Sequence, residues 1–357
     1  MPVRLAVLVI AAGLCLHAQM KMSVNQLVQF IRSSVQLKHP DKQVAAQVRK
    51  LALTDRLEDR IIEDLQGLGA GPRTVEALQG LRDQSKALTP AMIAAPKAPA
   101  PPIPPPSADE QNKVLAAARD FALNYSKQLP NFICTQVTTR YVDPSGLEFW
   151  QKADVITSKV SFFEQKEDYK VILVNSQPVT QDVHISQVGG FTTAGEFGSM
   201  LKEIFEAESE AAFTWTRWTT LRGQRNHVFG FQVRQDKSKR TVSYQKTMVV
   251  TPGYRGSIYV DANTNMITRV RLDHDLPPTF PITQAVIDLD YDLVDIGGVG
   301  AYMLPLRHVA RIREAKLLQK NEAEFRMYRK FGADTSITFE TPEPLPEDKF
   351  KEEPPLR

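Results

Sequence analysis

The sequence predicts an α+β protein in which a small all-α N-terminal domain and a proline-rich linker precede a large antiparallel sheet. Three observations lead to this prediction. Apolar residues recur at helical spacing through residues 20–88, and eight prolines lie between Pro90 and Pro106. After Pro130 the apolar spacing changes from about 3.6 residues to about two, the period of a half-buried strand.

The composition is that of a globular protein. Of the 357 residues, 42% are hydrophobic and 24% are charged, which excludes a chain disordered throughout and a multi-span membrane protein. Residues 109–340 carry 28 basic and 28 acidic side chains, so this region is neutral. A neutral sheet domain argues against nucleic acid as a partner.

The first eighteen residues are typical of a signal peptide. Arg4 is followed by an apolar stretch from Leu5 to Leu16 and by Ala18 at the expected cleavage site. The stretch is shorter than the ~20 residues of a membrane-spanning helix. We therefore expect an exported protein, periplasmic or secreted, with no transmembrane span after cleavage.

The N-terminal domain is expected to contain four short helices. Ser23 can cap a helix over 24–35, and Asp41 precedes a second apolar stripe at helical spacing. A third helix is expected after Thr54, and Pro72 is suited to the first position of a fourth.

The linker, residues 89–108, is expected to be an extended spacer. The sheet domain, 109–340, is expected to begin with one helix and to contain one inserted helix over 195–208, whereas the tail, 341–357, is expected to be disordered. Strands joined by short turns predict an antiparallel meander. The predicted strands are Phe132–Tyr141, Leu147–Val160, Tyr169–Val174, Ala212–Leu221, Val228–Gln235, Arg240–Val249, Gly256–Asp261, Met266–Asp273, Ala285–Asp295, Met303–Arg313 and Glu322–Phe331.

The layout of the sheet domain resembles that of the LolA/LolB lipoprotein-carrier superfamily. The resemblance rests on the long N-terminal helix, the helix inserted among antiparallel strands, and the hairpin of Gly256–Asp261 with Met266–Val270. It implies a curved half-barrel whose concave face holds acyl chains. No carrier residue can be mapped individually, so the resemblance implies a fold and no site.

Alternation along three predicted strands places aromatic and apolar side chains on shared faces. We interpret this surface as a binding site for an apolar ligand, such as a lipid or a lipidated protein. A second hypothesis is a structural or interaction protein of the cell envelope, with a filled core and with residues 20–88 docking an envelope partner. The six candidate ligand-binding residues are Phe213, Trp215, Phe229, Phe231, Tyr244 and Met248.

Residues 68–78 resemble the helix-hairpin-helix motif of DNA-binding proteins, in which amides at a helix N-terminus bind a backbone phosphate. This resemblance supports a third hypothesis, an envelope-associated DNA binder. The simpler interpretation is a glycine turn between two packed helices. The candidate nucleic-acid residues are Gly69, Gly71, Arg73 and Thr74.

The sequence predicts no catalytic residue, no metal site and no cofactor, and therefore no enzyme. Ser199–Lys202 matches S-x-x-K without the companion motifs of acyl-transfer enzymes. Asp273–Asp275 is the nearest approach to a ligand cluster. A stripe of aspartates, in which adjacent members are ~6.6 Å apart along a strand, faces a stripe of arginines and predicts cross-strand pairing. These stripes are Asp288, Asp290 and Asp292, and Arg307, Arg311 and Arg313.

Export predicts a defined mature N-terminus. Protein recovered from the envelope or the medium should begin near Gln19, because the signal segment ends at Ala18. N-terminal sequencing checks this directly, and recovery of cytoplasmic protein that retains Met1 would contradict it.

Overall fold

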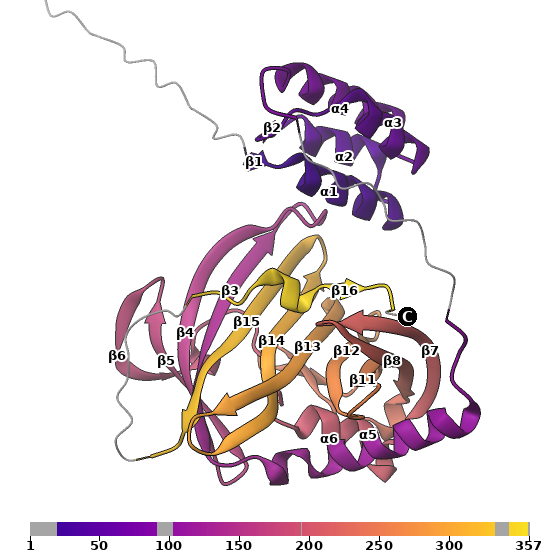
Figure 1. Ribbon diagram of the computed structural model, residues 1–357. Helices are drawn as coiled ribbons and strands as arrows, with labels where there is room; N and C mark the ends of the chain where they lie inside the picture. The colour runs from indigo at the N-terminus through magenta and orange to yellow at the C-terminus, as the bar shows by residue number, and fades with distance from the viewer. Residues whose placement is uncertain (1–19, 91–102, 194, 333–342, 356–357) are drawn as a thin grey trace, which may run out of the picture. The chain divides into compact units, whose positions relative to one another are not determined.

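The computed structural model describes residues 20–90, 103–193, 195–332 and 343–355. The chain divides near residue 100 into two compact units, and the smaller one is at the indigo end of the colour gradient in Figure 1. The predicted signal peptide and much of the predicted linker lie outside the described residues. Of the helices that are described, none has both the length and the apolar character needed to cross a membrane.

The smaller unit contains the four expected helices and, in addition, a two-stranded parallel ladder. Met20 pairs with Leu51 and Met22 with Leu53, so the prediction of an all-α domain is corrected. The two extended segments pair with each other and thereby satisfy backbone groups that would otherwise lack hydrogen-bond partners. The elements are β1 (Met20–Met22), α1 (Val24–Gln36), α2 (Asp41–Val48), β2 (Leu51–Leu53), α3 (Asp59–Gly67) and α4 (Pro72–Gln84).

The helix starts follow the sequence signals with one exception. Ser23 and Gln26 form a reciprocal capping box at the start of α1, and Pro72 occupies the first turn of α4. The third helix begins at Asp59 and not directly after Thr54. Residues 54–58 are instead non-helical and are held by hydrogen bonds to other parts of the domain. The amide of Thr54 donates to Met22 O, and the amide of Leu57 donates to Ser85 Oγ.

The larger unit is built on one antiparallel sheet of twelve strands in the order β16-β7-β8-β11-β12-β13-β14-β15-β3-β4-β5-β6. The α+β class is therefore confirmed, and the sheet is open, with β16 and β6 at its edges. The strands of this sheet are β3 (Phe132–Asp143), β4 (Gln151–Phe163), β5 (Lys166–Val174), β6 (Gln177–His184), β7 (Ala212–Leu221), β8 (Gln224–Val233), β11 (Gly253–Asp261), β12 (Ile267–Asp275), β13 (Ile282–Ile296), β14 (Gly300–Glu314), β15 (Leu317–Lys330) and β16 (Glu352–Glu353).

The sheet consists of two meanders joined where β15 pairs with β3, two strands far apart in the sequence. The predicted strand over 240–249 is instead a small separate hairpin of β9 (Val242–Tyr244) and β10 (Met248–Val250). Gln245 and Lys246 between them both have positive φ, +49° and +59°, which forms a tight hairpin turn. Strand β6 has no counterpart in the prediction.

Helices α5 (Ala108–Gln128) and α6 (Ser199–Phe205) pack against one face of the sheet, called here the inner face (Figure 1). Helix α6 is shorter than the predicted 195–208, because Gly195 and Gly198 have φ of +104° and +127°, outside the helical region. A continuous apolar cluster fills the space beneath both helices. It includes Ala118, Tyr125, Leu201, Ile204, Phe229, Ile258, Leu272 and Leu289.

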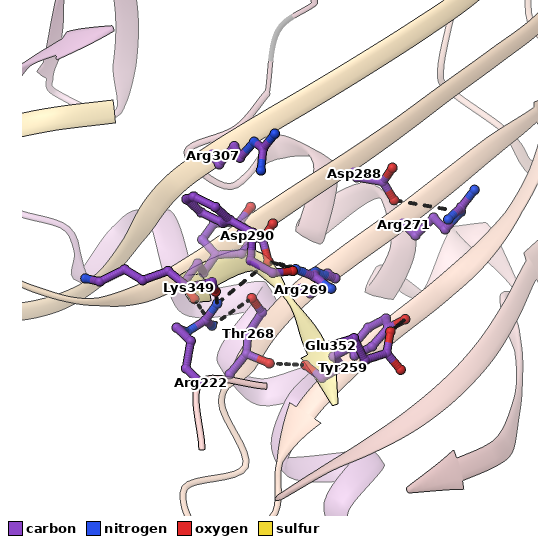
Figure 2. Close-up of polar contacts among 12 residues, drawn as sticks. Arg222, Tyr259, Thr268, Arg269, Arg271, Asp288, Asp290, Arg307, Lys349 and Glu352 are labelled. Atoms are coloured by element: carbon purple, nitrogen blue, oxygen red, sulfur yellow. Dashed lines mark hydrogen bonds and ion pairs between the residues drawn. The ribbon is translucent and has the colours of Figure 1, made fainter. Parts of the chain in front are cut away.

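The opposite, outer face carries the predicted aspartate and arginine stripes, and Asp288 pairs with Arg311 as predicted, whereas Asp292 binds Arg222 and Arg307 binds Glu322 instead. Asp288 forms an ion pair with Arg311 at 2.8 Å. Asp290 is more deeply buried and is bound by Arg269 at 2.7 Å, with Arg222 at 3.7 Å (Figure 2). Within the described ranges, no group of three or more His, Cys, Asp or Glu side chains is placed to bind a metal ion.

The C-terminal segment 343–355 lies across this outer face, where we had expected disorder. It forms a 3₁₀ turn, η4 (Glu347–Phe350), and then β16, which pairs with the edge strand β7. Arg269 donates to Phe350 O at 2.7 Å, and Tyr259 donates to Glu352 at 3.1 Å (Figure 2). The segment is therefore held mainly by side chains of the outer face, which no local pattern in the tail reveals.

Removing Asp290 should destabilise the protein much more than removing its neighbour on the same stripe. Asp290→Ala leaves the Arg269 guanidinium group buried without its carboxylate, while Arg222 keeps its ion pair with Asp292 at 3.6 Å, and the cost should be about 3 kcal/mol. Asp292→Ala is the matched control, because its side chain is 34% exposed against 6% for Asp290, and it should cost less than about 1 kcal/mol. Urea unfolding of the two variants and the wild type measures both costs, and equal costs would contradict the prediction.

Candidate ligand cavity

Four of the six predicted ligand-binding residues lie together on the inner face. Phe229 and Phe231 are buried in the cluster beneath α5 and α6, and Phe213 and Trp215 are partly buried against it. The ring of Phe205 from α6 stacks on Phe213 with centroids 5.0 Å apart. In this structure α6 thus covers part of the predicted surface.

The other two predicted residues lie elsewhere, on the β9–β10 hairpin. The ring of Tyr244 packs against Phe280 in a separate small cluster, and Met248 is 43% exposed. The hairpin is not part of the main sheet, so alternation along a continuous strand did not apply to these two residues.

A cavity of about 440 Å³ lies beside the aromatic cluster, between α6, two loop segments and the inner face of β12–β14. Its apolar side comes from alternating residues of β13 and β14, whose side chains are nearly fully buried. None of the six predicted residues lines it. The apolar lining residues from these strands include Ile282, Ala285, Ile287 and Ala310.

The polar side of the cavity is formed by Arg240, Glu203 and His274. Arg240 forms an ion pair with Glu203 of α6 at 2.6 Å. His274 Nδ1 lies 2.9 Å from Ala285 O. Burial, and secondarily the charge of Arg240, lowers the pKa of His274 to about 4, so the imidazole is neutral near pH 7.

His274 was part of the Asp273–Asp275 cluster singled out in the sequence, but strand alternation separates its members. His274 points to the inner face, whereas Asp273 and Asp275 both pair with Arg255. The S-x-x-K residues are also separated. Ser199 lines the cavity, while Lys202, one helical turn later, is exposed and does not.

A buried polar cluster anchors the chain segment that enters α6. Glu196 is 1% exposed, and its carboxylate lies 3.1 Å from His308 Nδ1 and accepts from Thr193 at 3.0 Å. The hydroxyl of Tyr291 donates to Glu196 O. The segment next to the cavity is therefore attached to β13 and β14 from inside the fold.

Glu167 of β5 extends this cluster. The Tyr169 hydroxyl lies 2.7 Å from Glu167 and 3.2 Å from Glu196, yet it has one proton to donate. A proton on Glu167 allows both contacts to be hydrogen bonds. Consistent with this, burial and then the charge of Glu196 raise the pKa of Glu167 to about 7. Burial would also raise the pKa of Glu196, but hydrogen bonding and ion pairing with His308 outweigh it and lower the pKa to about 2.

The predicted nucleic-acid residues form the turn into α4, as the glycine-turn interpretation requires. Gly69 has φ +104°, and a Cβ atom at Gly71 would collide with the side chain of Asp41. The Asp41 carboxylate accepts from the amides of Arg73 and Thr74, at 3.0 and 2.9 Å, and from the Thr74 hydroxyl at 2.7 Å. The helix N-terminus that would bind a phosphate is thus already occupied by a carboxylate of the same domain.

No protein-family model matches the chain, and no curated protein sequence matches it. Among solved structures, it is similar to a LolA superfamily protein from Nitrosomonas europaea, with 10% identity, a TM-score of 0.32, and coverage of 62% of this chain and 93% of that one. A DUF1329 family protein from Desulfovibrio piger shows 11% identity and a TM-score of 0.31 over 62% and 95% of the two chains.

A third similarity is to the MucA/MucB complex of Pseudomonas aeruginosa, with 10% identity, a TM-score of 0.19, and coverage of 63% and 100%. All three TM-scores are below 0.5, so any ligand is inferred here from the cavity alone.

Glu167 predicts that stability falls as the pH rises. A carboxyl group whose folded pKa is about 7, against an ordinary 4.5, stabilises the fold fully below pH 4.5 and loses this contribution as the pH rises through 7. Between about pH 5 and pH 8 the free energy of unfolding should therefore fall by about 1–3 kcal/mol from this group. Glu167→Gln, which resembles the protonated form, should remove that part of the change.

Urea unfolding of both proteins at the two pH values isolates this contribution, because the other titrating groups are common to them. Glu164→Gln, in the neighbouring exposed turn, is the control and should behave as the wild type does. An identical pH dependence in Glu167→Gln and the wild type would contradict the assignment.

Proposed function

We propose that the larger unit is a half-barrel that binds the apolar chain of a lipid or of an acylated protein, in an exported protein without enzymatic activity. The observation that carries this proposal is the cavity of about 440 Å³ on the inner face of the sheet. Its volume falls within the ~300–1,000 Å³ of small-molecule sites. One side is apolar and the other is polar, which suits an amphiphile.

The six aromatic and apolar residues predicted from the sequence have a secondary place in this proposal. Phe213, Trp215, Phe229 and Phe231 adjoin α6, which also forms one wall of the cavity. A chain too long for the cavity would extend along these residues if α6 moved away from the sheet. Tyr244 and Met248 would border the entrance, since their hairpin includes Val242 and Ser243, which line the cavity.

The filled cluster beneath α5 and α6 favours the second hypothesis, a structural or interaction protein of the envelope. In that case the core would be fully packed in solution, no lipid would accompany the protein, and the smaller unit would carry the partner contact. The two functions differ in one measurable property, which is bound lipid.

Native mass spectrometry of protein purified from its own envelope tests the proposal. The wild type should carry a lipid, and after delipidation it should bind a lauroyl amphiphile. Ala285→Leu fills the cavity, because Ala285 is 7% exposed and lines its floor, and should weaken this binding at least fivefold while the protein stays folded. Ala301→Leu, at an exposed position of β14, is the matched control.

The same titration with Trp215→Ala examines the proposed extension. Affinity for a lauroyl ligand should not change, whereas affinity for a longer acyl chain should fall. Absence of lipid from the wild type, with no binding of any added amphiphile, would favour the packed interaction protein.

A further inference from the structure

We propose that the cavity selects an uncharged polar head that both accepts and donates hydrogen bonds, with Arg240 donating to it and His274 accepting from it. This inference rests on the proposed binding of an apolar chain and names the chemistry of the attached head. A monoacylglycerol or a fatty amide has such a head. A fatty acid, which is ionised at neutral pH, and a simple alkyl ester do not.

His274 offers an acceptor because its tautomer is fixed. Ala285 O, 2.9 Å from Nδ1, has only lone pairs and can only accept, so Nδ1 carries the hydrogen. In a neutral ring Nε2 then has a free lone pair. Nε2 has no hydrogen-bond partner among the described residues, and the ring lines the cavity. A hydroxyl or N–H group of the ligand can supply the missing donor.

Arg240 offers donors on the same side of the cavity. One nitrogen of its guanidinium, Nη1, binds Glu203, whereas Nε is buried and has no partner among the described residues. The side chain is 11% exposed, so water satisfies it poorly. Because Nε has almost no accessible surface, a carbonyl or ether oxygen of the ligand would bind the second terminal nitrogen of the guanidinium, Nη2, which does not take part in the bond to Glu203.

The charges around the cavity favour an uncharged head. Arg240 is neutralised by Glu203, and the adjacent Lys239 by Glu206 at 2.6 Å. An anion would therefore lose its hydration without gaining an unpaired cation. Arg311 also borders the cavity, but its guanidinium group lies on the outer face, where it pairs with Asp288.

Three ligands with the same lauroyl chain separate these possibilities in the delipidated full-length protein. Monolaurin has an acceptor and donors, methyl laurate has acceptors only, and laurate is an anion. Isothermal titration at neutral pH should show monolaurin binding about tenfold more tightly than either of the others, the factor expected from one hydrogen bond of about 1.4 kcal/mol.

Replacing His274 tests the acceptor. His274→Phe keeps an aromatic ring but removes Nε2, and should reduce the preference for monolaurin over methyl laurate from about tenfold to about twofold or less. His184→Phe, at an exposed position that does not line the cavity, is the control and should keep the full preference. If His274→Phe does not fold, the wild-type preference and its reduction in Arg240→Gln decide the matter.

The outcomes distinguish this inference from the proposed function. Equal affinities for the three ligands, or tightest binding of laurate, would overturn the head-group inference and leave chain binding in place. If none of the three binds, the proposed function fails and the inference fails with it. A preference for monolaurin that survives in both His274→Phe and Arg240→Gln would show that other groups recognise the head.

Discussion

The alternation of side chains along β13 is the constraint on which the larger unit depends. Ile287 and Leu289 face the helices and Ala285 lines the cavity, while Asp288 and Asp290 face the outer side. A slip of one residue would place carboxylates beneath the helices and apolar groups on the outer face, so the register is strongly specified. The same alternation supplies the floor of the cavity and the anchors for the C-terminal segment. Both faces therefore depend on one pairing register.

The main group of buried polar side chains on the inner face lies where the chain enters α6. Glu196 and His308 are nearly fully buried there, and Glu167 and Tyr169 extend the contacts, although His308 Nε2 has no partner among the described residues. Such a cluster is costly unless each group has a partner, so it holds the segment in one position relative to the sheet. This segment and α6 form one wall of the cavity. The shape of the cavity is thus set by polar contacts, although its floor is apolar.

Periodicity predicted the parts of this structure that depend on local sequence. The helix starts at Ser23 and Pro72, the long strands and the pairing of Asp288 with Arg311 were all accessible in this way. The pairing of β15 with β3 was not, because nothing in either strand specifies a partner so distant in the sequence. The residues that form the polar wall of the cavity were also not predicted, because they come from segments far apart in the sequence. Arg240 belongs to a segment that the pattern assigned to a continuous strand, and only the parity of β12 could have indicated that His274 faces inward.

Asp41 has a consequence for any anion that approaches the smaller unit. Its carboxylate is covalently part of the same domain, so it is present at the N-terminus of α4 at an effective concentration that a dissolved ion rarely reaches. Burial would raise its pKa, but hydrogen bonds from Thr74 and Arg73 outweigh this and lower it, so the carboxylate stays ionised well into the acid range. A phosphate group would have to displace a negatively charged carboxylate that is tethered in place. The turn resembles a phosphate-binding motif, but its anion-binding position is already occupied by the protein's own Asp41.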